Sequence, residues 1–378
     1  MKDKARVYLD NAATTRVRQE VWDTMRLAFC EEYGNPSSVH TEGQYARKLL
    51  EEARKSIASN LNCSPQEIYF TSCGTESDNW AIQGVAEANK EEKRHIITSS
   101  IEHPAVIKSC GFLEEKGFRV TYLPVDRSGL VSLDSLAKAL TPDTCLVSIM
   151  LGNNEIGTIE PVRELAAIAH KGGAVFHTDA VQAVGTIPVD VSSLQVDLLS
   201  LSAHKFHGPK GVGALFVRKN VKITPFIYGG SQERQYRAGT ENLPGILGMA
   251  KALQLACDEM DTARNRISSL RDILEHGISG IYPKVILHGN KMNHLPGILN
   301  CSFPGKDGEK LLLMLNYYGF ACSGGAACSS QNSDVSHVLT AIGTSKDEAG
   351  NSIRISIGSE NTEEEIRDFL ECLRKLLS

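Results

Sequence analysis

Short apolar segments rich in β-branched residues alternate with segments of helical character through the middle of this chain. The apolar segments have the length of strands, and we expect strands over residues 67–71, 95–99, 119–125, 145–151, 174–179, 196–201 and 213–218. Between them we expect a helix that ends near residue 91 and helices over 101–116, 133–140 and 162–171. Repeated strand–helix units of this length imply a mostly parallel sheet between helical layers. The sequence therefore predicts an α/β fold.

The chain on either side of this region has a different pattern. Before it, we expect a helix over 18–33 and a second one with an apolar stripe from Tyr45 to Leu61. After it come a long loop, 226–242, and one long helix with a stripe from Ile246 to Leu274. The C-terminal part then has expected strands over 285–288, 297–303 and 352–357 and helices over 306–317, 335–342 and 362–377. We expect a large domain over 21–264, a small α+β domain over 265–378, and an N-terminal arm, 1–20, that joins the small domain.

Composition excludes several classes of protein. The net charge of −5 does not require a basic face, which argues against nucleic-acid binding. No apolar run approaches the roughly 18 residues of a membrane span, and the first residues show no secretory signal. The ten cysteines form no CxxC pairs with zinc spacing, so we expect no metal site and mostly small buried thiols. We therefore expect a cytoplasmic protein that binds neither nucleic acid nor membrane.

Lys205 follows directly on the expected strand over 196–201, in the stretch Ser202-Ala203-His204-Lys205. Ligands of open α/β sheets sit at the carboxyl ends of strands. A lysine in that position is placed to form a Schiff base with a carbonyl cofactor. A free lysine titrates near about 10.4, so such a site must lower the pKa of this amine. The simple alternative is an exposed loop lysine.

A second feature is the turn around Gly74 and Thr75, between the expected strand over 67–71 and the helix that follows. A strand, a glycine-containing turn and a helix N-terminus together form an anion site, since free backbone N–H groups and the helix dipole point at one spot. The alternative is ordinary N-capping by Ser72 or Thr75.

Further polar residues fall at or just after the ends of expected strands. Each has a simple explanation: His103 and Asp179 suit helix caps, and Gln182 suits a solvated surface. The full set is Thr75, His103, Asn154, Asp179, Gln182, Ser202, His204 and Lys205. Because all of them would meet at one sheet edge, we expect a single ligand with a phosphate, an aromatic ring with a basic nitrogen, a phenolic oxygen and an aldehyde. That ligand is pyridoxal 5′-phosphate.

The C-terminal part contributes two more candidates. Cys328 lies in a Gly/Ala/Ser-rich loop, where a thiol is expected to be exposed and reactive; a chance loop cysteine is the alternative. Arg354 alternates with apolar residues on an expected buried strand and therefore needs an anion. That anion is either a substrate carboxylate or an internal carboxylate. Cys322 is either a second thiol that works together with Cys328, a disulfide partner or, as we prefer, a small loop residue.

The sequence resembles the NifS-like cysteine desulfurases among the class V, fold-type I pyridoxal-phosphate enzymes. The motifs that carry the resemblance span nearly the whole chain in order: residues 8–15 (YLDNAATT), 34–38 (GNPSS), 74–79 (GTESDN), 102–103 (EH), 153–157 (NNEIG), 178–182 (TDAVQ), 202–205 (SAHK), 237–242 (RAGTEN) and 325–328 (GAAC). Each motif is weak alone, and the set is specific.

The resemblance implies a role for each matching residue. The catalytic residues would be the Schiff-base lysine Lys205, the ring-stacking His103, and Cys328, which takes the sulfur as a persulfide. Asp179 would pair with the pyridine nitrogen and Gln182 with the ring oxygen. The other expected cofactor contacts are Gly74, Thr75, Asn154, Ser202 and His204, with Thr240 reaching in from a second subunit. The expected substrate contacts are Asn11, Asn35 and Arg354.

The same resemblance implies a homodimer with shared active sites that converts L-cysteine to L-alanine. The sulfur would pass to an acceptor or scaffold protein for iron–sulfur clusters or for thiolation of tRNA. The stretch 323–328 (SGGAAC) differs from the family's usual SSGSAC, which leaves the acceptor open. Selenocysteine lyase shares these motifs and is the main alternative. An aminotransferase would leave Cys328 without a role, and a scaffold protein would not need an intact set of cofactor residues.

Overall fold

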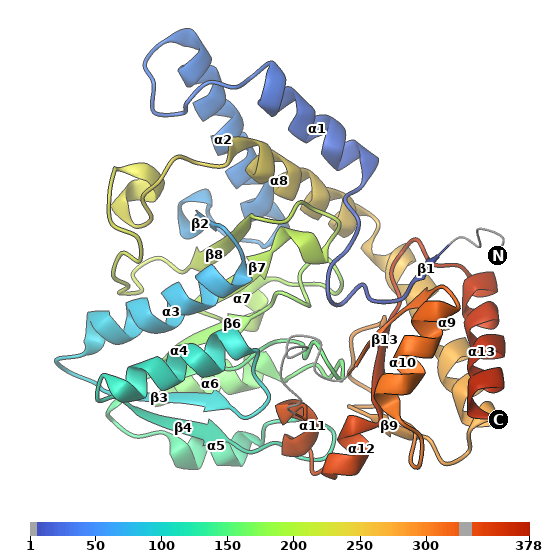
Figure 1. Ribbon diagram of the computed structural model, residues 1–378. Coiled ribbons are helices and arrows are strands. Elements are labelled where there is room, and N and C mark those ends of the chain that lie inside the picture. Colours follow the sequence, from blue (N-terminus) through green and yellow to red (C-terminus); the bar gives the residue numbers. More distant parts are fainter. Residues whose placement is uncertain (1–5, 325–334) are drawn as a thin grey trace.

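The computed structural model describes residues 6–324 and 335–378 and contains a central seven-stranded sheet (Figure 1). Its strand order is β2-β8-β7-β6-β5-β3-β4. The strands are β2 (Ile68–Thr71), β3 (His95–Ser99), β4 (Arg119–Leu123), β5 (Thr144–Ser148), β6 (Val175–Asp179), β7 (Leu198–Ser202) and β8 (Gly213–Val217). All neighbours are parallel except β8, which runs antiparallel to both β2 and β7. The predicted α/β fold with a mostly parallel sheet is confirmed.

Helices cover both faces of this sheet. Successive side chains of a strand point to opposite faces, and here the side chains on both faces are apolar and need to be buried. Ile96, Leu146 and Leu198 belong to the core under α3 and α4. Their chain neighbours Ile97 and Leu199 face the opposite core, which includes residues of α1, α2, α6 and α8. These helices are α1 (Gln19–Cys30), α2 (Thr41–Asn60), α3 (Gly74–Asn89), α4 (Pro104–Glu115), α5 (Leu133–Ala139), α6 (Val162–Lys171), α7 (Val191–Leu194) and α8 (Leu243–Asp258). Figure 1 shows α3 and α4 side by side on one face.

The C-terminal part has a sheet and a core of its own. The sheet has the antiparallel order β12-β13-β10-β9 and packs on α9, α10 and α13. Its elements are α9 (Met260–Ile281), β9 (Ile286–His288), β10 (Ile298–Ser302), α10 (Gly308–Tyr317), β11 (Phe320–Ala321), β12 (Ser323–Gly324), α11 (His337–Ala341), α12 (Lys346–Gly350), β13 (Ser352–Ser356) and α13 (Glu363–Leu377). The N-terminal strand β1 (Val7–Tyr8) pairs in parallel with β11. The exact domain limits stay a prediction.

The prediction of a single long helix between the two parts is wrong. Two helices occupy the region, because the run breaks at Glu259, which ends α8 and precedes α9. The carboxylate of Glu259 is bound by Arg18, with 2.7 Å between Nη1 and Oε2. A break of one residue leaves both apolar stripes intact, so the sequence pattern does not reveal it. Four short elements, α7, β11, β12 and α12, were also not predicted. Among the described residues, no helix is long and apolar enough to cross a membrane.

Candidate active site

A cavity of about 270 Å³ opens at the carboxyl ends of β6 and β7, beside the N-terminus of α3. Ten of the predicted site residues line it: Gly74, Thr75, His103, Asn154, Asp179, Gln182, Ser202, His204, Lys205 and Arg354. The carboxyl ends of neighbouring parallel strands meet at one edge of a sheet, so a single ligand can reach residues far apart in sequence. The predicted gathering of these side chains is therefore what the structure contains.

The N-terminus of α3 forms one wall of the cavity. Cys73 is the N-cap residue, and no side chain of the described residues caps this helix, so neither Ser72 nor Thr75 plays the capping role. A Cβ on Gly74 would lie 2.6 Å from Cγ2 of Val181, which means that only glycine permits this approach of helix and loop. The hydroxyl of Ser202 is buried beside it and has no hydrogen-bond partner in the part of the chain that the structure describes. Uncapped N–H groups and an unpaired hydroxyl are the groups that a phosphate would satisfy.

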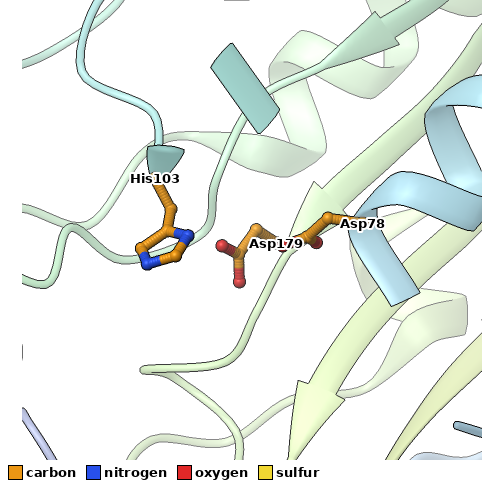
Figure 2. A group of neighbouring side chains, drawn as sticks. All are labelled: Asp78, His103 and Asp179. Atoms are coloured by element: carbon orange, nitrogen blue, oxygen red, sulfur yellow. The ribbon is translucent and has the colours of Figure 1, made fainter. Parts of the chain in front are cut away.

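Asp179 ends β6 and is 5% exposed (Figure 2). Its Oδ1 accepts a hydrogen bond of 2.9 Å from the backbone N–H of Val181. Burial raises the pKa of this carboxyl, while His103, that N–H group and Lys205 lower it. Asp179 is therefore a carboxylate with few fixed partners on a buried wall, which suits the basic nitrogen of an aromatic ring.

His103 lies beside Asp179 in Figure 2, on the side opposite to Asp78. It caps α4, because its Nδ1 accepts a hydrogen bond of 3.1 Å from the N–H of Ala105. Burial lowers the pKa of its imidazole; the carboxylate of Asp179 raises this pKa, and Lys205 lowers it, with a net lowering. A capping Nδ1 fixes a neutral ring with the proton on Nε2. Capping and a role in the cavity are therefore compatible.

Asp78, on the second turn of α3, is a site residue that the sequence analysis missed. One carboxylate oxygen of Asp78, one of Asp179 and one ring nitrogen of His103 lie within 4.8 Å of one another. This spacing would also admit a metal ion. We interpret the three side chains as part of an organic-ligand site, because Lys205, Ser202 and an uncapped helix share the same cavity. The expected absence of a metal stays a prediction.

Lys205 is held against the N-terminal arm. Its Nζ donates to the carbonyl oxygens of Ala12, at 2.6 Å, and Ala13, at 2.9 Å. The adjacent His204 places Nδ1 3.2 Å from Oγ1 of Thr14. Burial and the charge of Lys205 lower the pKa of His204 to about 4, so its imidazole is neutral near pH 7. The arm thus fixes the amine at the cavity without giving it an anionic partner in these two contacts.

Arg354 reaches the cavity from β13 and is 2% exposed. Its Nη2 lies 2.9 Å from Oδ1 of Asp10, and its Nη1 donates to the carbonyl oxygen of Asn154 at 3.0 Å. Nε is buried and has no partner among the described residues. Arg354 therefore has the internal ion pair that was one of its two predicted explanations, and it keeps one donor for a ligand.

Three of the other predicted residues do not line this cavity. Asn11 lies nearby but hydrogen-bonds the backbone of Ser356 through Nδ2, at 2.9 Å. Asn35 and Thr240 are exposed and do not line the cavity. Cys328 lies outside the described residues.

Comparisons with known proteins find matches that cover nearly the full length of this chain. The family model described as aminotransferase class-V matches residues 7–369. A protein of Methanosarcina thermophila named cysteine desulfurase IscS is 50% identical over 98% of this chain and 92% of its own length. One of Dictyoglomus turgidum with the same name is 51% identical over 99% and 95%. The solved structure of a NifS-like protein superposes with a TM-score of 0.93 at 44% identity and covers 98% of this chain and 99% of its own.

Proposed function

The chain belongs to the aminotransferase class-V family and is a cysteine desulfurase, and we propose that it works with pyridoxal 5′-phosphate bound in the cavity around Asp179 and Lys205. The observation that carries this proposal is the cavity itself, where Lys205, a buried carboxylate and an uncapped helix N-terminus meet. These are the groups that an aldehyde, a pyridine nitrogen and a phosphate require. The resemblance read from the sequence motifs is confirmed at the level of family and fold.

Each part of the cofactor has a counterpart in the cavity. Asp179 would face the ring nitrogen, and neutral His103 would lie on the ring face. Gln182 would reach the phenolic oxygen; at present its Nε2 donates to the carbonyl oxygen of Ala12, at 2.8 Å. The phosphate would take the N–H groups of α3 together with Thr75, Ser202 and His204. When bound, the cofactor supplies an electron sink for negative charge at the substrate α-carbon.

The chain's own groups then move the protons and the sulfur. Lys205 takes a proton from the α-carbon of L-cysteine. The thiolate of Cys328 attacks the sulfur of the substrate, so that an S–S bond forms while the Cβ–S bond breaks. The carbon keeps the electron pair of the broken bond and is protonated, which gives L-alanine. Cys328 is left as a persulfide, from which an acceptor protein takes the sulfur.

The described residues on both sides of the Cys328 loop support this assignment. Ser323 pairs in register with Arg354, a cavity residue. Beyond the loop, His337 places Nε2 2.9 Å from the carbonyl oxygen of Glu102, next to His103. Both ends of the loop are therefore fixed close to the cavity wall.

The decisive experiment measures alanine and sulfide released from L-cysteine with a reductant. We expect the wild type to form both products and Lys205→Ala to form neither. Cys328→Ala should keep the yellow colour of bound cofactor and lose sulfide release. Cys322→Ala is the matched control, since it removes a half-buried thiol of the same region, and it should retain activity. Wild-type sulfide release by Cys328→Ala would contradict the persulfide step. Faster turnover of selenocysteine than of cysteine would favour the alternative, a selenocysteine lyase.

The sulfur acceptor, the homodimer and the cytoplasmic location are parts of the same proposal. The relatives are named cysteine desulfurase, which supports the removal of sulfur from cysteine, and we propose that an acceptor or iron–sulfur scaffold protein takes this sulfur up. The nine cysteines among the described residues are free thiols, which agrees with a reducing compartment.

A further inference from the structure

Asp78 is a buried acid that the proposed reaction does not use. It is 1% exposed, and its Oδ1 has no hydrogen-bond partner among the described residues. In Figure 2, Asp179 lies between Asp78 and His103. Asp78 lines the same cavity on the side of Asp179 that faces away from His103, so its protonation state sets the charge next to the Asp179 carboxylate.

A chain of buried polar groups leads to Asp78 from the middle of the sheet. The Oγ of Ser148 lies 2.8 Å from Nδ1 of His177, and Nε2 of His177 lies 3.0 Å from Oγ of Ser200. Hydrogen bonding from Ser200 lowers the pKa of Asp78 and so opposes the larger effects of burial and of Asp179. Nε2 of His177 lies 3.7 Å from Oδ1 of Asp78. Burial lowers the pKa of His177 to about 3, so this imidazole is neutral and supplies no positive charge. Asp78 is thus surrounded by dipoles rather than by cations.

Two carboxyl groups this close in a buried place cannot both be ionised. Burial and the charge of Asp179 raise the pKa of Asp78 well above its usual value. Of the two carboxyl groups, Asp179 is the one that is ionised, because it accepts a hydrogen bond from the N–H of Val181 and because Lys205 lowers its pKa. The titratable groups near Asp78 on the surrounding elements are Cys73, Glu102, His103, His177 and Asp179.

We propose that Asp78 is a positioning residue, a neutral carboxylic acid that acts through Asp179 and leaves Asp179 as the single carboxylate facing the ring nitrogen of the ligand. An ionised Asp78 would add a second negative charge within 4.8 Å of Asp179 and would raise the proton affinity of everything that Asp179 contacts. The neutral acid fills the space, bonds to Ser200 and adds no charge. The identity of the ligand rests on the proposed function, whereas the protonation of Asp78 does not.

The first test is thermal unfolding of the full chain with and without added cofactor, as a function of pH. A carboxyl whose pKa is raised by folding takes up a proton on folding, so its stability contribution is present below the unfolded pKa of about 3.9 and is lost as pH rises above it. Asp78→Asn removes this loss. We expect the Tm of Asp78→Asn minus the Tm of the wild type to increase by about 2 °C per pH unit between about pH 5 and pH 8.

The exposed Asp134→Asn is the matched control and should show no such trend. A difference between Asp78→Asn and the wild type that stays constant or reverses with pH would mean that Asp78 is ionised and would overturn the proposal. This test decides the matter even if the chain binds no pyridoxal 5′-phosphate, which would instead count against the proposed function.

The second test follows the visible absorbance of the holoenzyme through a pH titration. The quantity compared is the pH at the midpoint of the absorbance change. We expect this midpoint in Asp78→Asn to lie within about 0.3 pH unit of the wild-type value, because the substitution replaces one neutral group by another of equal size. Asp78→Ala admits water beside Asp179 and should shift the midpoint by about 0.5 unit or more. A purely structural role would change stability and leave the midpoint in place. Equal midpoints for the Ala and Asn variants, or a shift of about one unit in Asp78→Asn, would overturn the proposal.

If Asp78→Ala does not fold, Ser200→Ala serves in its place, since it removes the hydrogen bond to Asp78 without touching the cavity lining. The midpoint of Ser200→Ala should then shift in the same direction, and an unchanged midpoint would count against the proposal.

Discussion

At the scale of single residues, Arg354 illustrates how an internal partner and a ligand can share one side chain. Asp10 and the carbonyl oxygen of Asn154 each take one terminal nitrogen of the guanidinium, and Nε remains unpartnered among the described residues. Arginine has five N–H donors in a fixed plane, so an ion pair on one edge orients the remaining donors. We infer that Asp10 holds Arg354 in the orientation in which it can receive the carboxylate of L-cysteine.

Replacing Arg354 by lysine tests that role. The ammonium group keeps the charge and loses the planar set of donors, which costs a hydrogen bond to a charged group of about 1.5–3 kcal/mol. We expect the KM for L-cysteine to rise by about tenfold or more, with a smaller change in kcat, in steady-state alanine release. Asp10→Asn is the companion variant and should raise KM less, since it removes only the orienting charge. An unchanged KM in Arg354→Lys would show that the substrate carboxylate binds elsewhere.

Most residues of the cavity could be predicted from sequence, and the reason is geometric. His103, Asp179 and Lys205 each lie at or shortly after the end of an expected strand, and parallel strands bring their carboxyl ends to one edge. Asp78 was not predicted, because the periodicity of α3 says which face is buried but not what lies opposite it. The pairing of Asp10 with Arg354 was not predicted either, since the two residues are 344 positions apart and no local pattern connects them.

At the scale of elements, the loop between β8 and α8 owes its shape to one buried ion pair. Glu233, Arg234 and Gln235 all have positive φ, at 43°, 56° and 70°, which is unfavourable for residues with side chains. The guanidinium of Arg54 binds Glu233 at 2.7 and 2.8 Å, and the N–H of Phe70 donates to the same carboxylate at 2.9 Å. The backbone strain of this turn is offset by contacts to α2 and β2.

Glu233→Gln should therefore destabilise the fold. It leaves Arg54 buried beside a neutral group, and breaking a buried pair in this way costs about 3–5 kcal/mol. Urea unfolding would measure the loss, with Glu363→Gln as control, because the pair of Glu363 with Arg367 is exposed and contributes little. The double variant Arg54→Met/Glu233→Leu should recover part of the loss. A cost for Glu233→Gln no larger than that of the control would show that the ion pair does not hold the loop.

Loop shape of this kind lies beyond sequence patterns. The long loop over 226–242 was recognised from its lack of periodicity, whereas its order depends on Arg54 and Glu233, which are 179 positions apart. The break at Glu259 was missed for a related reason, since the contact with Arg18 that accompanies it joins distant parts of the chain. Periodicity reports burial of a face, and the ends of elements depend on partners that it does not specify.

At the scale of the whole molecule, exposed apolar side chains gather on α1, α2 and the loop that joins them. Trp22, Phe29, Tyr33 and Val39 are 49%, 56%, 73% and 85% exposed. Exposed apolar groups concentrated in one region mark interaction surfaces. Asn35, a predicted substrate contact that lies away from this chain's cavity, belongs to the same loop. These positions support the proposed homodimer, in which Thr240 of one subunit would complete the cavity of the other.

Subunit mixing tests that arrangement directly. Lys205→Ala inactivates the cavity of its own subunit, and Thr240→Glu would repel the phosphate in whichever cavity residue 240 enters. If residue 240 serves the partner's cavity, a mixed dimer contains one cavity with both wild-type groups, so random pairing of two inactive variants should restore about a quarter of wild-type activity. If Thr240 served its own subunit, every cavity would carry one defect and no activity would return.

Mixing Lys205→Ala with Asp179→Asn is the control. Both of those residues line the same cavity of one chain, so no pairing creates an intact site. Alanine release after co-expression with two affinity tags distinguishes these outcomes, and activity in the first mixture alone would establish that the active site is built from two subunits.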